Sequence, residues 1–293
     1  MKEMSPNGQG SSLSAEQIFI AARPLVDHFG IVVDPQTGGE AYAAALAQLN
    51  PRFVGDRHLV RWKLEADQTR WPEETTAVIK EAAEAMNMLK PETPLQGRFD
   101  LVLVLGGSRQ APADRARYAA QCLFNSADFS KVVVLGSRRL LDATEQANVA
   151  NYAPNAQTEA DLAEATIEVL EQEDNRLANV HGINPKLPYV YSHIVEKERA
   201  NNPDVIGSLL AEITAYGTPL EYELPKNFRL GAVTTQIYQS AVHLDLTRVA
   251  KGYGINEVFT AGNPSDPNVI AKRTTATYLG EILRTLRAAS YAL

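Results

Sequence analysis

Four apolar runs, each ending in glycine or threonine, constrain the fold of this chain more than any other feature. Residues 101–105 read Leu-Val-Leu-Val-Leu and lead directly into Gly106-Gly107. Three similar runs follow, at residues 132–135 before Gly136, 230–233 before Thr234-Thr235, and 258–260 before Ala261-Gly262. Continuous apolar runs without polar alternation are typical of parallel strands buried on both faces.

Helical periodicity follows each of these runs. The predicted helices cover residues 114–124, 158–171, 238–252 and 269–291. Strands that alternate with helices predict an α/β fold with a Rossmann-like, doubly wound, mainly parallel sheet. In such sheets, ligands bind beyond the carboxyl ends of the strands, so the glycine and threonine ends are the first place to look for a site.

The rest of the chain divides by composition and pattern. Residues 1–14 are rich in Ser, Gly, Asn and Pro and are expected to form a disordered tail. Residues 15–95 predict an N-terminal helical region, and 96–293 the α/β core. Within the core, residues 172–225 break the alternation. Two interpretations stay open: an insertion or cap between sheet elements, and ordinary crossover structure.

The charge balance bears on partners. With 28 Lys and Arg against 35 Asp and Glu, the net charge of −7 repels phosphate backbones, so we expect no nucleic-acid partner. Residues 52–70 mix basic and aromatic side chains, and a solvated helix face is the favoured interpretation over a phosphate or base site. The absence of a leader pattern and of any apolar run near 18 residues predicts a cytoplasmic protein without a membrane partner.

The single cysteine, Cys122, excludes an intrachain disulfide and a Cys-based metal cluster. We expect it to be a small buried side chain in a helix.

Two loops at strand ends carry the same chemistry. Gly106, Gly107, Ser108 and Arg109 combine a sharp backbone turn with a hydroxyl and a guanidinium suited to carboxylate or phosphate. The second loop, Gly136-Ser137-Arg138-Arg139, repeats this combination. A glycine pair after a strand also serves tight turns on geometric grounds alone, so the repetition is what favours a ligand site.

Three further residues are candidates. Glu159 opens a predicted helix after Thr158, where the helix dipole stabilises a carboxylate and where it could also accept from a ribose hydroxyl or an amine. Thr234 and Thr235 end the third apolar run and offer hydroxyls for phosphate or carboxylate, although threonine also favours strands on its own account.

Several standard motifs are absent from the sequence. The first glycine loop lacks the third glycine of G-x-G-x-x-G, and no P-loop pattern G-x-x-x-x-G-K-[ST] occurs. The five histidines show no H-x-x-x-H or HExxH spacing, so no metal is predicted. No G-x-S-x-G elbow is present, which disfavours the usual serine hydrolase of this fold class.

These strand ends together resemble the YdcF/SanA/ElyC-like family. The resemblance rests on residues 99–107, the strand and turn at 132–136, Thr158-Glu159-Ala160 and Val233-Thr234-Thr235, and it covers about residues 99–171 and 228–291. It implies a Rossmann-like core that binds S-adenosylmethionine or a nucleotide-like ligand, and a soluble branch without an anchor. Gly106, Gly107 and Glu159 carry over most directly. The His and Arg that this family tends to show after the Val-Thr strand end are here Tyr238 and Ala241.

Three functions compete at this point. The first is a YdcF-like protein that binds a small anionic or adenosine-type metabolite, with its reaction unknown. The second is a methyltransferase, which the basic Gly136-Ser137-Arg138 loop disfavours because an acidic residue is expected at that strand end. The third is a non-catalytic ligand-sensing or protein-interaction module. The sequence assigns neither a catalytic residue nor an oligomeric state.

Overall fold

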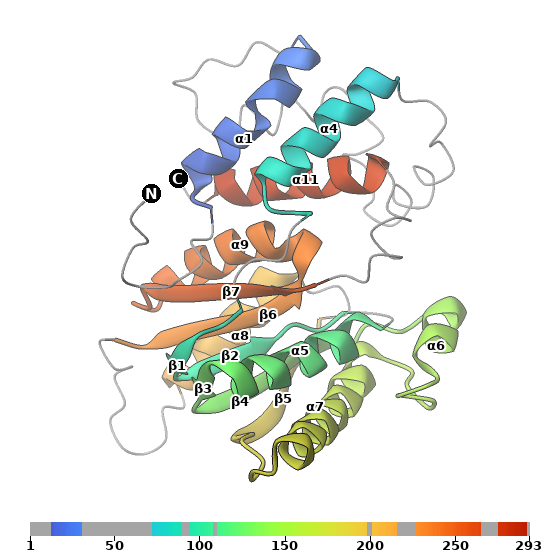
Figure 1. The fold of residues 1–293 in the computed structure, drawn as a ribbon, viewed down its shortest axis with the longest axis vertical. Helices are drawn as coiled ribbons and strands as arrows, with labels where there is room; N and C mark the ends of the chain where they lie inside the picture. Colours follow the sequence, from blue (N-terminus) through green and yellow to red (C-terminus); the bar gives the residue numbers. More distant parts are fainter. Residues whose placement is uncertain are drawn as a thin grey trace. The chain divides into compact units, whose positions relative to one another are not determined.

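The computed structural model describes residues 13–30, 72–89, 94–107, 110–197, 201–215, 227–264 and 275–291 (Figure 1). These residues belong to two compact units. The first, which we call the sheet unit, contains Thr93–Thr235 and Val249–Asn263. The second, the helical unit, contains Ser11–Glu92, Gln236–Arg248 and Pro264–Leu293.

The sheet unit is built on five parallel strands. Their order across the sheet is β5 (Tyr189–Val195), β4 (Lys131–Ser137), β2 (Leu101–Val104), β6 (Arg229–Thr235) and β7 (Glu257–Asn263). The chain starts in the centre at β2, moves outward through β4 to β5, and then returns to the other side of β2 for β6 and β7. The predicted doubly wound α/β fold is confirmed, with every strand of this sheet parallel.

Helices cover both faces of this sheet. On one face α5 (Ala111–Asn125) and α7 (Glu159–His181) pack over a core of alanine and valine side chains that includes Val102, Val104 and Val134. Successive residues of β5 show the two faces directly, because Ser192 bonds to Glu164 of α7 whereas His193 bonds to Ser208 of α8 (Asn202–Ala215). A two-stranded sheet of β1 (Gly97–Phe99) and β3 (Ala127–Phe129) adjoins this core.

The interpretation of residues 172–225 as an insertion is wrong for the residues that the structure describes. The first of them complete α7, which continues to His181 and ends at Gly182 in the left-handed conformation. Residues 189–195 then form β5, a strand of the main sheet, and residues 202–215 form α8, which packs on it. The segment is thus the ordinary crossover structure of a doubly wound sheet.

The helical unit joins segments from both ends of the chain. Its elements are α1 (Ala15–His28), α4 (Glu73–Ala85), the 3-10 turn η3 (Gln236–Tyr238), α11 (Thr275–Ser290) and the part of α9 (Gln239–Lys251) up to Arg248. Its core includes Ile18, Leu25, Ile79, Ile282 and Leu286, all inaccessible to solvent. The predicted boundary at residue 95 lies near the division between Glu92 and Thr93, whereas α11 and most of α9, which the sequence placed in the α/β core, belong to the helical unit. The predicted tail at 1–14 lies almost wholly outside the described residues, and the basic and aromatic stretch at 52–70 lies outside them entirely.

Ser14 and Gln17 form a capping box at the start of α1, with each side chain bonded to the other residue's backbone N–H. The expectation that Cys122 is buried in a helix is confirmed, because it lies in α5, where burial raises the pKa of its thiol to about 11. Among the helices that the structure describes, none has the length and apolar content needed to cross a membrane.

Candidate functional site

The carboxyl ends of β4, β2 and β6 meet at one edge of the sheet. Val104 is in register with Val134 of β4 and with Val233 of β6, so the residues that follow these three positions leave the sheet at the same level. Gly106, Gly136 and Thr234 are therefore brought together at this edge. Because the chain winds away from β2 in opposite directions, the gap between β2 and β6 is the topological switch point, where ligands bind in open α/β sheets.

Gly106 and Gly136 owe their identity to packing. A Cβ on Gly106 would lie 2.0 Å from the backbone oxygen of Leu135, because the ends of β2 and β4 approach too closely for any side chain. A Cβ on Gly136 would lie 2.8 Å from Ile194 Cδ1 and 3.1 Å from the backbone oxygen of Glu159, where α7 begins. These two glycines thus position the strand ends and the helix, as the geometric interpretation of a glycine turn requires.

Gly107 is required for its backbone conformation rather than for packing. Its φ of 145° is one that other residues rarely adopt, and a Cβ there would stand 3.5 Å from Nη1 of Arg115. The chain therefore turns at Gly107 so that its backbone passes close to a guanidinium of α5.

Arg115 lies at the switch point and ties its two sides together. Its Nη1 donates to the carbonyl of Leu105 at 2.7 Å and also to that of Gly106, while Nε and Nη2 donate to Thr235 Oγ1 at 3.1 and 3.0 Å. The residue is 5% exposed. A guanidinium is thus held between the end of β2 and the end of β6 by bonds to two carbonyls and a hydroxyl.

A polar group surrounds the start of α5, the helix that follows the glycine turn. Asp114 accepts from Arg117 at 3.1 Å and from Gln110 at 3.5 Å, and its side chain is 47% exposed. Burial raises the pKa of Asp114, against the opposing effect of these partners. Burial likewise raises the pKa of Tyr152 to about 12, with Asp114 contributing. The side chain of Gln110, the N-cap residue of α5, makes no capping hydrogen bond to the first turn of this helix.

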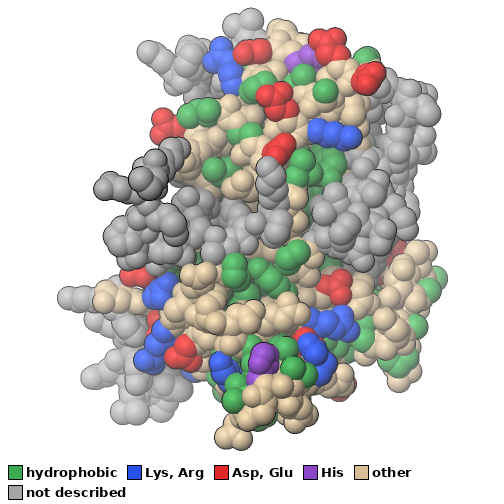
Figure 2. Space-filling view, in the orientation of Figure 1, with side chains coloured by type: hydrophobic (Ala, Val, Ile, Leu, Met, Phe, Trp, Pro, Cys, Tyr) green, Lys and Arg blue, Asp and Glu red, His purple; other side chains and the backbone are tan. Residues whose placement is uncertain are grey.

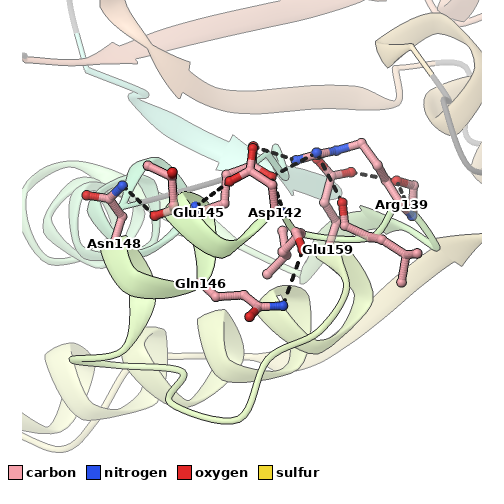
Figure 3. Close-up of polar contacts among 10 residues, drawn as sticks. Arg139, Asp142, Glu145, Gln146, Asn148 and Glu159 are labelled. Atoms are coloured by element: carbon pink, nitrogen blue, oxygen red, sulfur yellow. Dashed lines mark hydrogen bonds and ion pairs between the residues drawn. The ribbon is translucent and has the colours of Figure 1, made fainter.

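The second loop has a different character, because its arginines are neutralised by carboxylates (Figure 3). Arg139 makes a two-pronged ion pair with Glu145, at 3.0 Å for both contacts, and a third contact of 2.9 Å with Glu159. Ser137 donates to the other oxygen of Glu159 at 2.5 Å. Arg138 pairs with Glu196 at 3.1 Å on the exposed surface. The prediction that Gly136-Ser137-Arg138-Arg139 repeats the chemistry of the first loop stays a prediction, because Ser108 and Arg109 lie outside the described residues.

Glu159 belongs to this network of hydrogen bonds and ion pairs around Arg139. Its side chain is 16% exposed and both of its oxygens already accept hydrogen bonds. Arg139 is held between it and Glu145, which the capping box of α6 (Ala143–Val149) fixes through Asp142. The carboxylate thus stabilises the junction of β4, α6 and α7, and each of its oxygens already accepts one hydrogen bond from the protein.

The two threonines differ in what they offer. Thr234 is 1% exposed and lies within β6, paired with Gly262 of β7. Thr235 is only partly buried and its hydroxyl accepts from Arg115. Ser108 and Arg109 of the first loop lie outside the described residues, so their part in a site stays a prediction from the sequence.

Sequence reasoning missed Arg115. It is the one arginine of α5 that the structure buries, among the alanines Ala113, Ala116 and Ala119. The sequence did contain a signal for this residue: a charged side chain on the alanine face of the helix that follows a glycine turn. Within the described ranges, no group of three or more His, Cys, Asp or Glu side chains is arranged to hold a metal ion.

No protein-family model matches the chain. Among curated proteins, no match is found. The resemblance to the YdcF/SanA/ElyC-like family therefore stays a prediction, and the geometry of the sheet edge is the basis for assigning a function.

Proposed function

We propose that this chain binds a small anionic metabolite at the switch point, where β2 and β6 end. The observation that carries the proposal is Arg115, a buried guanidinium held at the edge of the sheet where ligands of this fold class bind. A buried positive charge attracts phosphate or carboxylate far more strongly than an exposed one, because solvent screens it less.

Two backbone features add donors to the same place. Gly107 has no side chain to keep a ligand away from the backbone of the turn, and α5 starts four residues later. A glycine turn that leads into a helix N-terminus directs backbone N–H groups at an anion. The Rossmann phosphate sites use this combination without requiring all three glycines of their motif for the charge itself.

The overall charge of −7 does not oppose this proposal. On the face seen in Figure 2, Lys and Arg side chains gather over the sheet unit, with Asp and Glu side chains among them. A local positive field inside an acidic protein is what an anionic ligand needs, because electrostatic attraction depends on nearby charges more than on the net charge.

An adenosine-type ligand, such as S-adenosylmethionine or a nucleotide, is the class we favour. Asp114 is nearly half exposed at the start of α5 and is able to accept from ribose hydroxyls or an amine, while Arg115 faces the anionic group. The resemblance noted in the sequence supports the same class. We assign no reaction to this site, and the competing role of a non-catalytic ligand sensor uses the same residues.

The experiment is a thermal-shift panel of nucleotides, S-adenosylmethionine, sugar phosphates and inorganic phosphate, combined with native mass spectrometry of the protein as purified. A ligand at 100 times its dissociation constant adds about 2.7 kcal/mol to the free energy of unfolding, which is a shift of several degrees. Thr235→Val removes the hydroxyl that orients Arg115 and should weaken binding about tenfold, or about 1.4 kcal/mol.

The matched control is Thr214→Val in α8, which loses a hydroxyl bonded to the helix backbone at Leu210. It should bind the same compound as tightly as the unaltered protein does. Equal affinities for Thr235→Val and Thr214→Val would contradict the assignment of the switch point as the binding site.

A further inference from the structure

Three side chains away from the switch point form a chain of hydrogen bonds. His193 of β5 lies between two residues of α8, with Nε2 3.2 Å from Ser208 Oγ and Nδ1 3.1 Å from Glu212 Oε2. The side chain of His193 is 8% exposed and that of Glu212 is 53% exposed, while Ser208 is exposed. The hydroxyl that ends the chain is thus open to solvent, and the imidazole behind it is not.

The helical repeat of α8 and the alternation of side chains along β5 together bring these three residues into contact. Ser208 and Glu212 are four residues apart on α8 and therefore lie on one face of that helix. His193 points toward α8 because residues alternate along a strand, and its neighbour Ser192 points toward α7. Packing of α8 on β5 holds the three side chains together without help from a loop.

The hydrogen bonds fix the tautomer of the imidazole. A carboxylate only accepts, so Nδ1 carries the proton that is donated to Glu212, and the neutral ring then presents the lone pair of Nε2 to Ser208. Burial lowers the pKa of His193, against the opposing effect of Glu212, so the neutral form prevails at pH 7. A hydroxyl, a base and a group that orients the base are the parts of an activated serine nucleophile.

We propose that Ser208 is a nucleophile that attacks small ester substrates, with His193 as its general base and Glu212 as a positioning residue. In this step Oγ of Ser208 forms a bond to the acyl carbon, Nε2 of His193 takes the hydroxyl proton, and the ester C–O bond breaks. The leaving alcohol receives that proton from His193. Water then attacks the acyl-serine with the same base, and the acid is released with Ser208 restored.

The residues beside this triad indicate which esters fit. Tyr189 and Tyr191 lie on the same face of β5 as His193, four and two residues before it, and their rings stack with centroids 5.6 Å apart. Tyr189 is 70% exposed. Burial raises the pKa of Tyr191, and the nearby carboxylate of Glu212 contributes to this rise. Two stacked aromatic rings at a sheet edge suit a flat aromatic group, so aryl esters are the expected class.

The position of Ser208 inside α8 sets the speed of the reaction. Backbone N–H groups in the interior of a helix bond to carbonyls one turn back, so they are not available to stabilise an oxyanion. Removal of one oxyanion donor costs 10²–10³ in rate in enzymes that have such donors. We therefore expect acylation of Ser208 by activated aryl esters and slow release, rather than rapid turnover.

The test is covalent labelling of the full chain at pH 7.5 with p-nitrophenyl acetate and with a fluorophosphonate, in which the P–F bond breaks and fluoride leaves. Intact mass and peptide mapping should place one acetyl or phosphonyl group on Ser208. Ser208→Ala should abolish labelling and keep its fold, because alanine favours an exposed helix position. Ser192→Ala is the matched control. Ser192 lies beside His193 on β5, but its hydroxyl bonds to Glu164 and not to a histidine.

Glu212→Gln separates a positioning role from a structural one. The rate of labelling should rise with pH as His193 loses its proton, and Glu212 of α8 is the charged group that raises the pKa of His193. Glu164 of α7 lies on the opposite face of β5, where its carboxylate accepts a hydrogen bond from Ser192. Without the carboxylate, the midpoint of the pH profile should move to lower pH and the plateau rate should fall at least tenfold.

Two results would overturn the proposal. One is labelling of Ser208→Ala as fast as the unaltered protein. The other is a labelling rate of the unaltered protein equal to that of a denatured sample, which would mean that the hydrogen bonds serve only to satisfy a buried imidazole. Either outcome leaves the proposed ligand at the switch point unaffected, because that site shares no residue with this triad.

Discussion

At the scale of single residues, the glycines at the sheet edge differ in what they tolerate, and this yields a graded prediction. Gly106→Ala should destabilise most, by about 3 kcal/mol or more, because its Cβ meets a backbone oxygen that has no room to move. Gly136→Ala should cost less, about 1–2 kcal/mol, because the nearest atom belongs to the flexible side chain of Ile194. Chemical denaturation of both variants measures the difference.

Gly280 provides the control for this series. A Cβ there meets nothing within 4 Å, and the residue lies inside α11. Gly280→Ala should therefore stabilise by about 0.5–1 kcal/mol, as alanine does in a helix interior. If Gly106→Ala were as well tolerated as Gly280→Ala, the close approach of β2 and β4 would not exist in solution.

Gln236 offers a second prediction at this scale. It is 1% exposed, and neither its amide nitrogen nor its oxygen has a hydrogen-bond partner among the described residues. An unpaired buried amide costs about 1–3 kcal/mol, so Gln236→Met, of similar volume, should raise the free energy of unfolding by about 1 kcal/mol. A loss of stability in urea denaturation would mean that the amide is paired in solution.

The residues show how far the sequence alone reaches. It marked Gly106, Gly107 and Thr235, because a glycine or threonine after a buried run is visible without knowledge of the fold. It did not mark Arg115, since only the fold shows that an arginine ten positions after Leu105 turns back to bond the carbonyl of that residue. Nor did it show that Glu145 and Glu159 neutralise Arg139, because charge partners are set by tertiary contact.

At the scale of elements, the start of α7 makes a prediction about pH. Burial alone would raise the pKa of Asp161, but hydrogen bonds from Gln157 and Thr158 outweigh it and the pKa is lowered. A lowered folded-state pKa contributes stability above the unfolded value, near pH 4, and this contribution is lost as the pH falls through the folded value.

Asp161→Asn tests this sign. Because the side chain is exposed, the effect should be modest, about 0.5–1 kcal/mol at pH 7, and the variant and the unaltered protein should converge toward pH 3. Urea denaturation across this range measures the difference. A difference that grows as the pH falls would contradict the account of this helix start.

The strands with continuous apolar runs could be predicted from the sequence, whereas the edge strand β5 could not. Its sequence reads Tyr-Val-Tyr-Ser-His-Ile-Val, and only His193 of its seven residues is fully buried, because β5 is an edge strand. The runs that form β2 and β4 are buried on both faces and need apolar residues at every position. An edge strand lacks that requirement, so its sequence carries a weaker signal.

At the scale of the whole molecule, the division into two units predicts separate responses to core mutations. Ile282 of α11 packs against α1 and α4, so Ile282→Ala should cost about 2–5 kcal/mol within the helical unit. Hydrogen exchange should then lose protection first in α1 and α4. Val133→Ala in β4 is the matched control and should expose the sheet unit instead.

Equal loss of protection in both units for either variant would show that they unfold together. The sequence did not predict this division, because it depends on contacts between α1 and α11, which lie more than 200 residues apart. Local patterns identify each helix, while the choice of partner is made by packing over long range.

The central claim is that an anionic metabolite binds where β2 and β6 end. Hydrogen exchange with and without the compound that raises the melting temperature tests it most directly, because it reports where the ligand acts. We expect protection in the peptides that contain Gly106-Gly107, the first turn of α5 and Thr235, and clearly weaker protection in Thr235→Val when both proteins are compared at a ligand concentration near the dissociation constant of the unaltered protein. Protection confined to other segments, with these peptides unchanged, would contradict it.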